Sequence, residues 1–352
     1  MSLPHEAATH LTRWLGDEWT AHPLAGDASV RAYYRVALPD GTTYMLAYYP
    51  EEVRAQLRRF LAAYEAVNRV RVSPRVGQVF QPAPREAGWK ACPTPEESIV
   101  PEVLESSELA VLQRDVGDRT LFDVLHDDRE KGIALYREAI DVLVAFQEAQ
   151  PGEVNPPFTA EFFFQELEMA REFYVEKLMS ADATELEPLM KSMCDDIAHH
   201  PYLLCHRDYH GQNIHVANDT LYVIDYQDLR MGPDTYDVAS LLRDRGVAIL
   251  LGDDVELELL EHYRAAVGAD ADIRRRYFET LLQRSIKILG TFSKQPITRG
   301  RMHYLDFIPA TLESIRRCLD ELPRYARLRD IFPLDFSVQQ ARERARSLNG
   351  QT

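Results

Sequence analysis

Two short apolar segments enclose a polar loop, and this arrangement constrains the chain more than any other feature. The loop, residues 206–213, reads HRDYHGQN; an apolar segment precedes it at 202–205 and another follows at 221–224. Short apolar runs bounded by polar residues are typical of buried strands. The second run ends directly before Asp225. We therefore expect two strands that hold the loop and this acid close together.

Three side chains in this stretch, Asp208, Asn213 and Asp225, are those that phosphoryl transfer from ATP requires. The reaction needs an oriented hydroxyl nucleophile and divalent cations that neutralise the triphosphate, but little covalent help. Asp208 is the candidate base. Asn213 and Asp225 are candidate Mg²⁺ ligands, because Mg²⁺ prefers oxygen donors. The alternative is a polar turn with solvated acids, in which Asp208 is a cap and Asn213 a turn residue.

The pattern His-Arg-Asp, four residues, Asn resembles the catalytic-loop signature of protein kinases. The continuation differs, because Tyr226-Gln227-Asp228 replaces Phe-Gly after Asp225 and no Ala-Pro-Glu segment follows. In this the chain resembles the aminoglycoside phosphotransferase and choline kinase superfamily, whose members phosphorylate small molecules. Segments 26–35, 115–120 and 232–237 resemble the bacterial anomeric kinases of N-acetylmuramate and N-acetylglucosamine.

This resemblance, over about residues 24–320, implies an α+β, two-lobed protein-kinase-like fold. It implies a small β-rich N-lobe over residues 1–115, with a proline-rich insertion at about 72–104. The larger helical C-lobe, residues 116–352, then carries the catalytic loop and the acceptor pocket. ATP and Mg²⁺ are the implied cofactors. The implied product is an amino sugar α-1-phosphate, which feeds nucleotide-sugar synthesis and cell-wall recycling.

The resemblance also assigns residues to the nucleotide. Asp27, Ala28 and Ser29 are expected to cover the phosphates, with a plain hairpin entry as the alternative. The run 109–115 reads as a strand that leads into the interlobe hinge, where Gln113 and Asp115 are nucleotide-binding candidates. For Asp115, and for Asp118 close by, ribose contact and helix capping both remain open.

One position departs from the kinase pattern. Protein kinases carry a lysine on the third strand that contacts the phosphates, whereas the matching strand here has Leu46 or Ala47 in its place. Arg31 and Arg35, on the preceding strand, are the nearest candidates for the missing charge. The anomeric sugar kinases are similar in lacking this lysine. Its absence also leaves open a nucleotide-binding regulator that does not turn over.

Other polar residues beside the loop are candidates for acceptor binding or for support. For Arg207 an ion pair is the alternative, and for Gln227 and Asp228 hydrogen bonding within the turn is the alternative. His206 is expected to pack beneath the loop, and Asp237 to accept backbone N–H bonds from it. The four acceptor-binding candidates are Arg207, His210, Gln227 and Asp228.

Composition narrows the partners. The net charge of −16 disfavours a nucleic acid or an anionic membrane, which need a basic face. Arg274-Arg275-Arg276 is a local exception, with a solvated helix face as the alternative. The same charge would suit a cationic acceptor. A small-molecule substrate is therefore expected. The alternatives to the amino sugar are an aminoglycoside, a choline-like alcohol, homoserine and thiamine. The oligomeric state is left open.

The expected location is the cytoplasm. The four cysteines are scattered without a CxxC spacing, so we expect reduced thiols rather than a zinc site or a disulfide framework. The chain has no uninterrupted apolar run of about 18 residues. Its first residues also lack the basic segment followed by an apolar segment that is typical of a signal peptide. We therefore expect neither a membrane-spanning segment nor a secretion signal.

Periodicity predicts a strand-rich start and a helix-rich remainder. Strands are expected at 29–36 and 43–49, joined by a turn at 39–41. Helices are expected at 7–20, 51–68, 119–149, 159–179, 183–199, 234–245, 253–267, 270–292 and 304–321.

Overall fold

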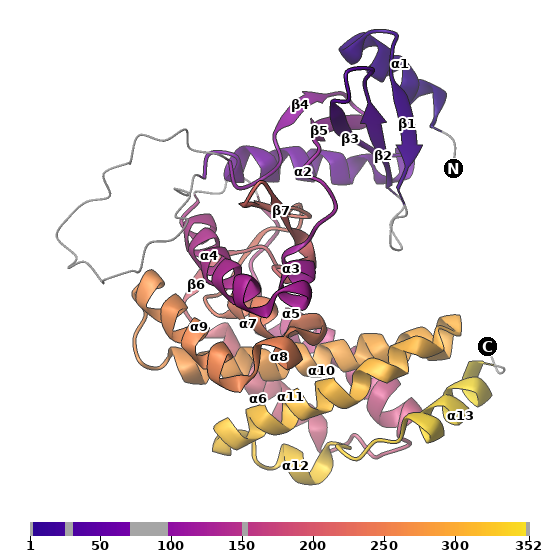
Figure 1. The fold of residues 1–352 in the computed structure, drawn as a ribbon. Coiled ribbons are helices and arrows are strands. Elements are labelled where there is room, and N and C mark those ends of the chain that lie inside the picture. Colours follow the sequence, from indigo (N-terminus) through magenta and orange to yellow (C-terminus); the bar gives the residue numbers. More distant parts are fainter. Residues whose placement is uncertain (1–2, 25–30, 71–97, 150–153, 350–352) are drawn as a thin grey trace. The chain divides into compact units, whose positions relative to one another are not determined.

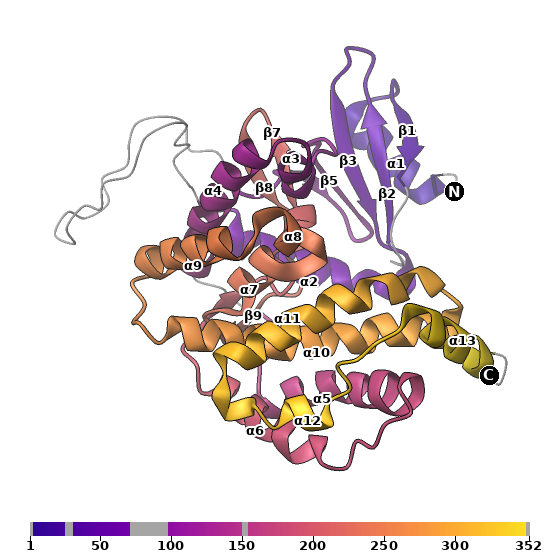
Figure 2. The same ribbon diagram turned by 60° about the horizontal axis from the view of Figure 1, so that its bottom comes forward.

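The computed structural model describes residues 3–24, 31–70, 98–149 and 154–349 (Figures 1 and 2). The chain forms two compact units. Unit 1 comprises residues 1–155 and 208–229, and unit 2 comprises residues 156–207 and 230–352. The lobe boundary expected between residues 115 and 116 stays a prediction. Most of the proline-rich insertion lies outside the described residues.

Unit 1 contains an antiparallel sheet of five strands in the order β1-β2-β3-β5-β4. The hairpin predicted from strands at 29–36 and 43–49 forms, although its strands begin at Ala32 and end at Tyr48; residues 29 and 30 lie outside the described part. Its turn closes at Gly41, whose φ of +87° favours glycine, and the Thr42 N–H donates to the Asp40 carboxylate. The strands are β1 (Thr20–Pro23), β2 (Ala32–Ala37), β3 (Thr43–Tyr48), β4 (Val103–Ser106) and β5 (Ala110–Arg114).

The sheet has two unlike faces, because successive side chains of a strand point to opposite sides. Tyr34, Leu46 and Leu112 lie opposite one another on β2, β3 and β5. They pack with Ala7 and Leu11 of helix α1 (His5–Leu15) in one buried cluster. Residues between them on each strand therefore point to the face away from α1.

Helix α1 is shorter than the predicted 7–20, which is wrong at both ends. It begins at His5 and ends at Leu15, because Gly16 takes a φ of +85° and its N–H bonds to the Thr12 carbonyl. Thr20, expected in the helix, starts β1 instead.

The other helices of unit 1 follow the predicted ones closely. The helix expected at 51–68 forms as a 3₁₀ turn (Glu51–Val53) and α2 (Arg54–Val67). The stretch 119–149 divides into α3 (Leu121–Asp127) and α4 (Arg129–Gln147). The division falls at Asp128, whose side chain accepts the Lys131 N–H and caps α4.

The two strands predicted beside the loop both form, but each pairs with a strand that was not predicted. In unit 1, β8 (Thr220–Val223) pairs with β7 (Ile214–Ala217). In unit 2, β6 (Tyr202–Cys205) pairs with β9 (Arg230–Pro233). The β7–β8 turn places Asn218 and Asp219 at positive φ, as a tight two-residue hairpin turn requires.

Unit 2 is built around the long helix α10, which contacts α5, α6, α7, α11 and α13. Figures 1 and 2 both show α11 alongside it. Gly290 of α10 lets the backbone of the neighbouring π-helix approach, because a Cβ there would lie 2.6 Å from the Ala170 nitrogen. The helices are α5 (Ala160–Met169), the π-helix η2 (Ala170–Leu178), α6 (Leu186–Ala198), α7 (Tyr236–Arg243), α8 (Val247–Leu251), α9 (Asp253–Val267), α10 (Ile273–Arg299), α11 (Ile308–Glu321), α12 (Leu328–Ile331) and α13 (Val338–Asn349).

Several predicted boundaries in unit 2 are wrong. The predicted end at 292 is too early, because α10 continues through the buried Pro296 to Arg299, so tertiary packing outweighs the proline. The helix expected at 304–321 divides into a 3₁₀ turn (Met302–Phe307) and α11, which has a proline in its first turn. In the described part of the chain, every helix is too short or too polar to cross a membrane.

Candidate functional site

Asp208, Asn213 and Asp225 all belong to unit 1, where a hydrogen-bonded hairpin joins them. Ile214 pairs with Val223 at the base of the β7–β8 hairpin, and the Ile224 N–H donates to the Asn213 carbonyl over 3.0 Å. Asn213 and the residue before Asp225 are therefore neighbours across the two strands.

The amide of Asn213 is oriented by the loop that precedes it. Its Nδ2 donates to the Asp208 carbonyl over 2.9 Å, and its backbone N–H donates to the His210 carbonyl over 2.8 Å. A side-chain amide whose nitrogen is used in this way turns its oxygen to the other side. The amide oxygen of Asn213 therefore points away from the Asp208 carbonyl.

Gly211 fixes the loop against the helices of unit 1. A Cβ at this position would lie 2.4 Å from the Tyr136 hydroxyl of α4 and 3.1 Å from the Phe122 nitrogen of α3. In the same loop the Tyr209 hydroxyl donates to the Ala139 carbonyl over 2.7 Å. The side chain of Asp208 is exposed, whereas His210 is buried. The loop therefore presents its acid outward from a rigid support.

Asp225 adopts a φ of +64°, a conformation that residues other than glycine rarely take. Such strain persists only where surrounding contacts impose it, and it gathers at functional sites. Two side chains donate to Asp225 Oδ1: Gln227 Nε2 over 2.9 Å and Arg31 Nη2 over 3.3 Å. The carboxylate remains 38% exposed, so it is held and still accessible. Gln227 thus makes the within-turn hydrogen bond that was the alternative to acceptor binding.

The donor set fits Mg²⁺. Within the described ranges, no group of three or more His, Cys, Asp or Glu side chains could hold a metal ion. The predicted pair, one carboxylate and one amide oxygen, suits Mg²⁺, which keeps several waters and takes its other ligands from substrate phosphates. Asn213 and Asp225 would hold the ion. Such a site is incomplete without a nucleotide.

In unit 2, Asp237 at the start of α7 binds the first two residues of the loop. The carboxylate is fully buried and accepts the His206 N–H over 2.6 Å and the Arg207 N–H over 2.9 Å. Burial raises the pKa of Asp237, although these backbone donors oppose the rise. Arg207 has a φ of +81°, so the carboxylate stabilises a strained backbone. These are the contacts that the predicted support role of His206 and Asp237 requires.

Arg284 of α10 was not predicted, yet it contacts the same segment. Its Nη1 donates to the Arg207 carbonyl over 3.2 Å, and its Nη2 donates to Ser240 Oγ over 2.9 Å and to the Asp244 carboxylate. An arginine within a sequence of helical periodicity gives no signal for such a contact. Arg207 itself lies 3.8 Å from Glu166, which is the ion pair that was the alternative to acceptor binding.

On the sheet, Arg35 binds both acids of the predicted nucleotide region. Its guanidinium donates to Asp115 over 2.6 Å and to Asp118 over 2.7 Å. The Asp115 carboxylate also accepts the Gly117 N–H. Helix capping by Asp115 or Asp118 is wrong, because Thr120 caps α3 through a reciprocal capping box. Asp27, Ala28 and Ser29 lie outside the described residues.

The remaining candidates are Gln113 and Asp228. Gln113 lies on β5 opposite Met45 of β3, on the face turned away from α1. Asp228 follows Gln227 in the turn after Asp225 and is partly exposed. Their predicted roles in nucleotide and acceptor binding stay predictions.

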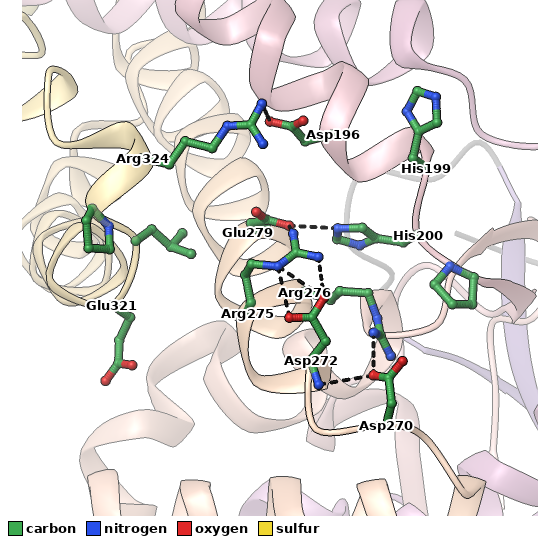
Figure 3. Close-up of a pocket in the computed structure, with 13 residues that line it drawn as sticks. Asp196, His199, His200, Asp270, Asp272, Arg275, Arg276, Glu279, Glu321 and Arg324 are labelled. Atoms are coloured by element: carbon green, nitrogen blue, oxygen red, sulfur yellow. Dashed lines mark hydrogen bonds and ion pairs between the residues drawn. The ribbon is translucent and has the colours of Figure 1, made fainter.

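A pocket in unit 2 holds a different set of charges. It has a volume of about 540 Å³ and is lined by side chains from α6, α10 and the segments after α9 and α11 (Figure 3). Arg275 donates to Asp272 over 2.5 Å and to Glu279 over 2.7 Å, while Arg276 donates to Asp270 over 2.8 Å. Of the described residues that line it, Arg275 and Arg276 belong to the basic segment noted in the sequence, and none is a predicted catalytic, metal-binding or nucleotide-binding residue.

Comparison with known proteins supports the fold. An aminoglycoside phosphotransferase with ADP bound superposes with a TM-score of 0.56 at 14% identity, covering 90% of this chain and 99% of that one. A choline kinase from Streptococcus pneumoniae also gives 0.56 at 14% identity, covering 90% and 97%. With the antiparallel sheet and the mostly helical remainder, they confirm the predicted α+β, protein-kinase-like fold.

Sequence comparison identifies the family. An N-acetylmuramate/N-acetylglucosamine kinase from Neisseria meningitidis is 26% identical over 325 residues, 88% of each chain. A kinase of the same name from Pseudomonas aeruginosa is 26% identical over 233 residues, 63% of this chain and 68% of the relative. The profile of the phosphotransferase enzyme family matches residues 20–278. The chain belongs to this family and is a phosphotransferase that acts on a sugar or another alcohol.

Proposed function

We propose that this phosphotransferase uses ATP to phosphorylate the anomeric hydroxyl of N-acetylmuramate or N-acetylglucosamine, giving the sugar 1-phosphate. The reaction type rests on one observation above all: Asn213 is bonded both to the Asp208 carbonyl and, through its backbone, to the residue before Asp225. The acceptor rests on the two named relatives, which are 26% identical to this chain.

Each group has a separate task in the proposed reaction. Asp208 accepts the proton of the attacking hydroxyl, for which an exposed carboxylate on a rigid loop is suited. Asn213 and Asp225 hold Mg²⁺, which when bound neutralises charge on the transferring phosphoryl group. His206, Arg207 and Asp237 fix the backbone that leads into Asp208. Positioning and electrostatics thus account for most of the catalysis.

ATP as the donor is supported by the family and by the solved relative with bound ADP. In the proposal the nucleotide lies against the sheet face turned away from α1, near Gln113. Asp115 is held by Arg35 close by and is the candidate for a ribose contact. Binding of adenosine alone, measured by calorimetry, should therefore weaken in Asp115→Ala.

The test is ADP release with Mg²⁺ and a panel of N-acetylmuramate, N-acetylglucosamine, choline, homoserine and kanamycin. We expect turnover with the two amino sugars alone. A response to choline, homoserine or kanamycin instead would move the acceptor to another class. ATP binding without turnover on any acceptor would identify a nucleotide-binding regulator.

The position of phosphorylation has its own control. Transfer to the anomeric oxygen removes the reducing end, so reducing-sugar signal should disappear in step with ADP release. The methyl glycoside of N-acetylglucosamine has no anomeric hydroxyl and should not be phosphorylated. Phosphorylation of the methyl glycoside at the same rate would exclude the anomeric position.

A further inference from the structure

The sheet face turned away from α1 lacks the lysine that kinases use to contact the phosphates. Ala47 of β3 lies between Tyr33 of β2 and Val111 of β5, and all three point to this face because their neighbours pack on α1. Ala47, rather than Leu46, therefore occupies the lysine's place. It is 2% exposed and carries no charge.

Arg31 supplies a positive charge directly before the adjacent strand, since Ala32 is the first residue of β2. It lies two residues before Tyr33, and its guanidinium carbon is 5.8 Å from the Tyr33 ring and 6.0 Å from the Tyr49 ring. These distances suit cation–π contacts, which restrain the side chain. The guanidinium reaches Asp225, the predicted metal ligand, over 3.3 Å. The Arg31 side chain is only 12% exposed, so its charge is held beside this carboxylate.

Arg35, the other candidate, is committed elsewhere. It lies within β2 opposite Met45, on the sheet face turned away from α1. Four hydrogen bonds of 2.6–3.2 Å tie its guanidinium to Asp115 and Asp118. An arginine that is neutralised by two carboxylates has little net charge to offer a phosphate.

We propose that Arg31 replaces the missing strand lysine: it holds Asp225 before the nucleotide binds and contacts the nucleotide phosphates once it has bound. The inference rests on the proposed function, because it needs a nucleotide at Asp225. A guanidinium suits both partners, since its planar fork matches carboxylate and phosphate oxygens alike. The positive charge has moved one strand across the sheet, from the position of Ala47 to Arg31.

The experiment measures nucleotide binding by calorimetry, apart from turnover. Arg31→Ala should weaken binding of a non-hydrolysable ATP analogue with Mg²⁺ about ten- to hundredfold, as the loss of a charge-assisted contact predicts. Binding of adenosine, which has no phosphate, should not change. Arg13→Ala, an exposed charge at the end of α1, is the matched control and should bind both ligands as the wild type does.

A second variant restores the charge at the original place. Adding Ala47→Lys to Arg31→Ala should recover most of the lost affinity for the ATP analogue, provided that circular dichroism shows a folded protein. If the crowded site at Ala47 prevents folding, added guanidinium ion should instead rescue Arg31→Ala and leave the wild type unchanged. If the protein is folded and neither Ala47→Lys nor added guanidinium ion restores binding of the ATP analogue, the inference is overturned.

Two other results would also overturn it. Wild-type affinity for the ATP analogue in Arg31→Ala would show that Arg31 does not contact phosphate. An equal loss for adenosine and for the analogue would assign Arg31 a structural role only. Failure of the proposed function looks different, because the wild-type protein would then bind no nucleotide or would phosphorylate none of the acceptors.

Discussion

The carboxylates near the β7–β8 hairpin and those of the Arg275–Arg276 pocket differ in what they can still bind. In the pocket, Arg275 lowers the pKa of Asp272 and Arg276 lowers the pKa of Asp270, so both acids are ionised and already paired. Among the described residues, Asp225 instead meets one guanidinium, at 3.3 Å, and its side chain remains 38% exposed.

The difference shows that a high density of charge does not by itself make a site. The pocket has the greater number of ionic groups, yet arginines take up the acids that line it. The hairpin region has few ionic groups, but Asp225 lies on a strained backbone and the Asn213 amide is oriented by its bond to the Asp208 carbonyl. We therefore expect substitutions at the hairpin to change turnover and substitutions in the pocket to change stability.

The largest expected effect is that of Asp208→Ala. Removal of a general base should lower kcat about 10²- to 10⁴-fold, with the melting temperature near that of the wild type, because this side chain is exposed. Asp270→Ala is the matched change in the pocket, since it also removes a largely exposed acid. ADP release should be unaffected in that variant. Equal losses of kcat in the two variants would remove the distinction between the regions.

Arg276→Ala should produce the largest loss of stability in the pocket. Arg276 and Asp234 form a pair whose side chains are 6% and 5% exposed, and removal of Arg276 takes away the guanidinium that binds this buried carboxylate. Such a change costs about 3–5 kcal/mol in the free energy of unfolding, measurable by urea denaturation. Arg275→Ala removes a half-exposed arginine and should cost less. Equal costs would show that burial of the pair is not what matters.

Asp237 sharpens the comparison, because backbone N–H groups rather than arginine side chains bind this acid most closely. Asp237→Ala removes the acceptor of the buried His206 N–H, at about 1–3 kcal/mol, and that of the partly buried Arg207 N–H, at a smaller cost. Both stability and kcat should therefore fall. Asp237→Asn keeps the shape and one acceptor, so its losses should be smaller. A stable Asp237→Ala with unchanged kcat would contradict the support role.

Much of the hairpin site could be predicted from the sequence, because its chemistry lies in adjacent residues. The motif placed Asp208 and Asn213 on one loop, and the apolar run before Asp225 placed that acid at a strand end. The pairing of those strands could not be predicted. Both runs are four residues long, and no short-range signal shows that β8 pairs with β7 while β6 pairs with β9.

Contacts between distant residues account for the rest of what the sequence missed. Nothing local to Arg284 indicates a hydrogen bond to a carbonyl 77 residues away. Arg31 and Arg35 have the same residue type and lie in the same predicted strand, so the pattern offered both for the missing charge. The structure distinguishes the two arginines by their partners. Arg35 binds Asp115 and Asp118, which follow β5, whereas Arg31 binds Asp225. The strand order that places the end of β5 within reach of Arg35 could not be predicted from the sequence.

Substitution of Arg35 should have the smallest effect. This arginine shows that unit 1 also contains carboxylates already paired with an arginine, those of Asp115 and Asp118. Its hydrogen bonds lower the pKa of Asp118; burial alone would raise the pKa of Asp115, but the bonds from Arg35 and the Gly117 N–H outweigh it and lower that pKa too. A carboxylate with a lowered pKa in the folded state stabilises the fold above its ordinary pKa near 3.9, and this stability is lost as pH falls further.

The melting temperature of Arg35→Gln should therefore lie below that of the wild type at pH 6. The gap should narrow as pH falls from about 4 toward 2.5, because protonated Asp115 and Asp118 no longer need the guanidinium. Arg13→Gln controls for the loss of a surface charge and should show no such narrowing. A gap that stayed constant over this range would mean that Arg35 stabilises β2 by packing along its hydrocarbon stem rather than through the two carboxylates. The contrast between paired and available acids would then not extend to this strand.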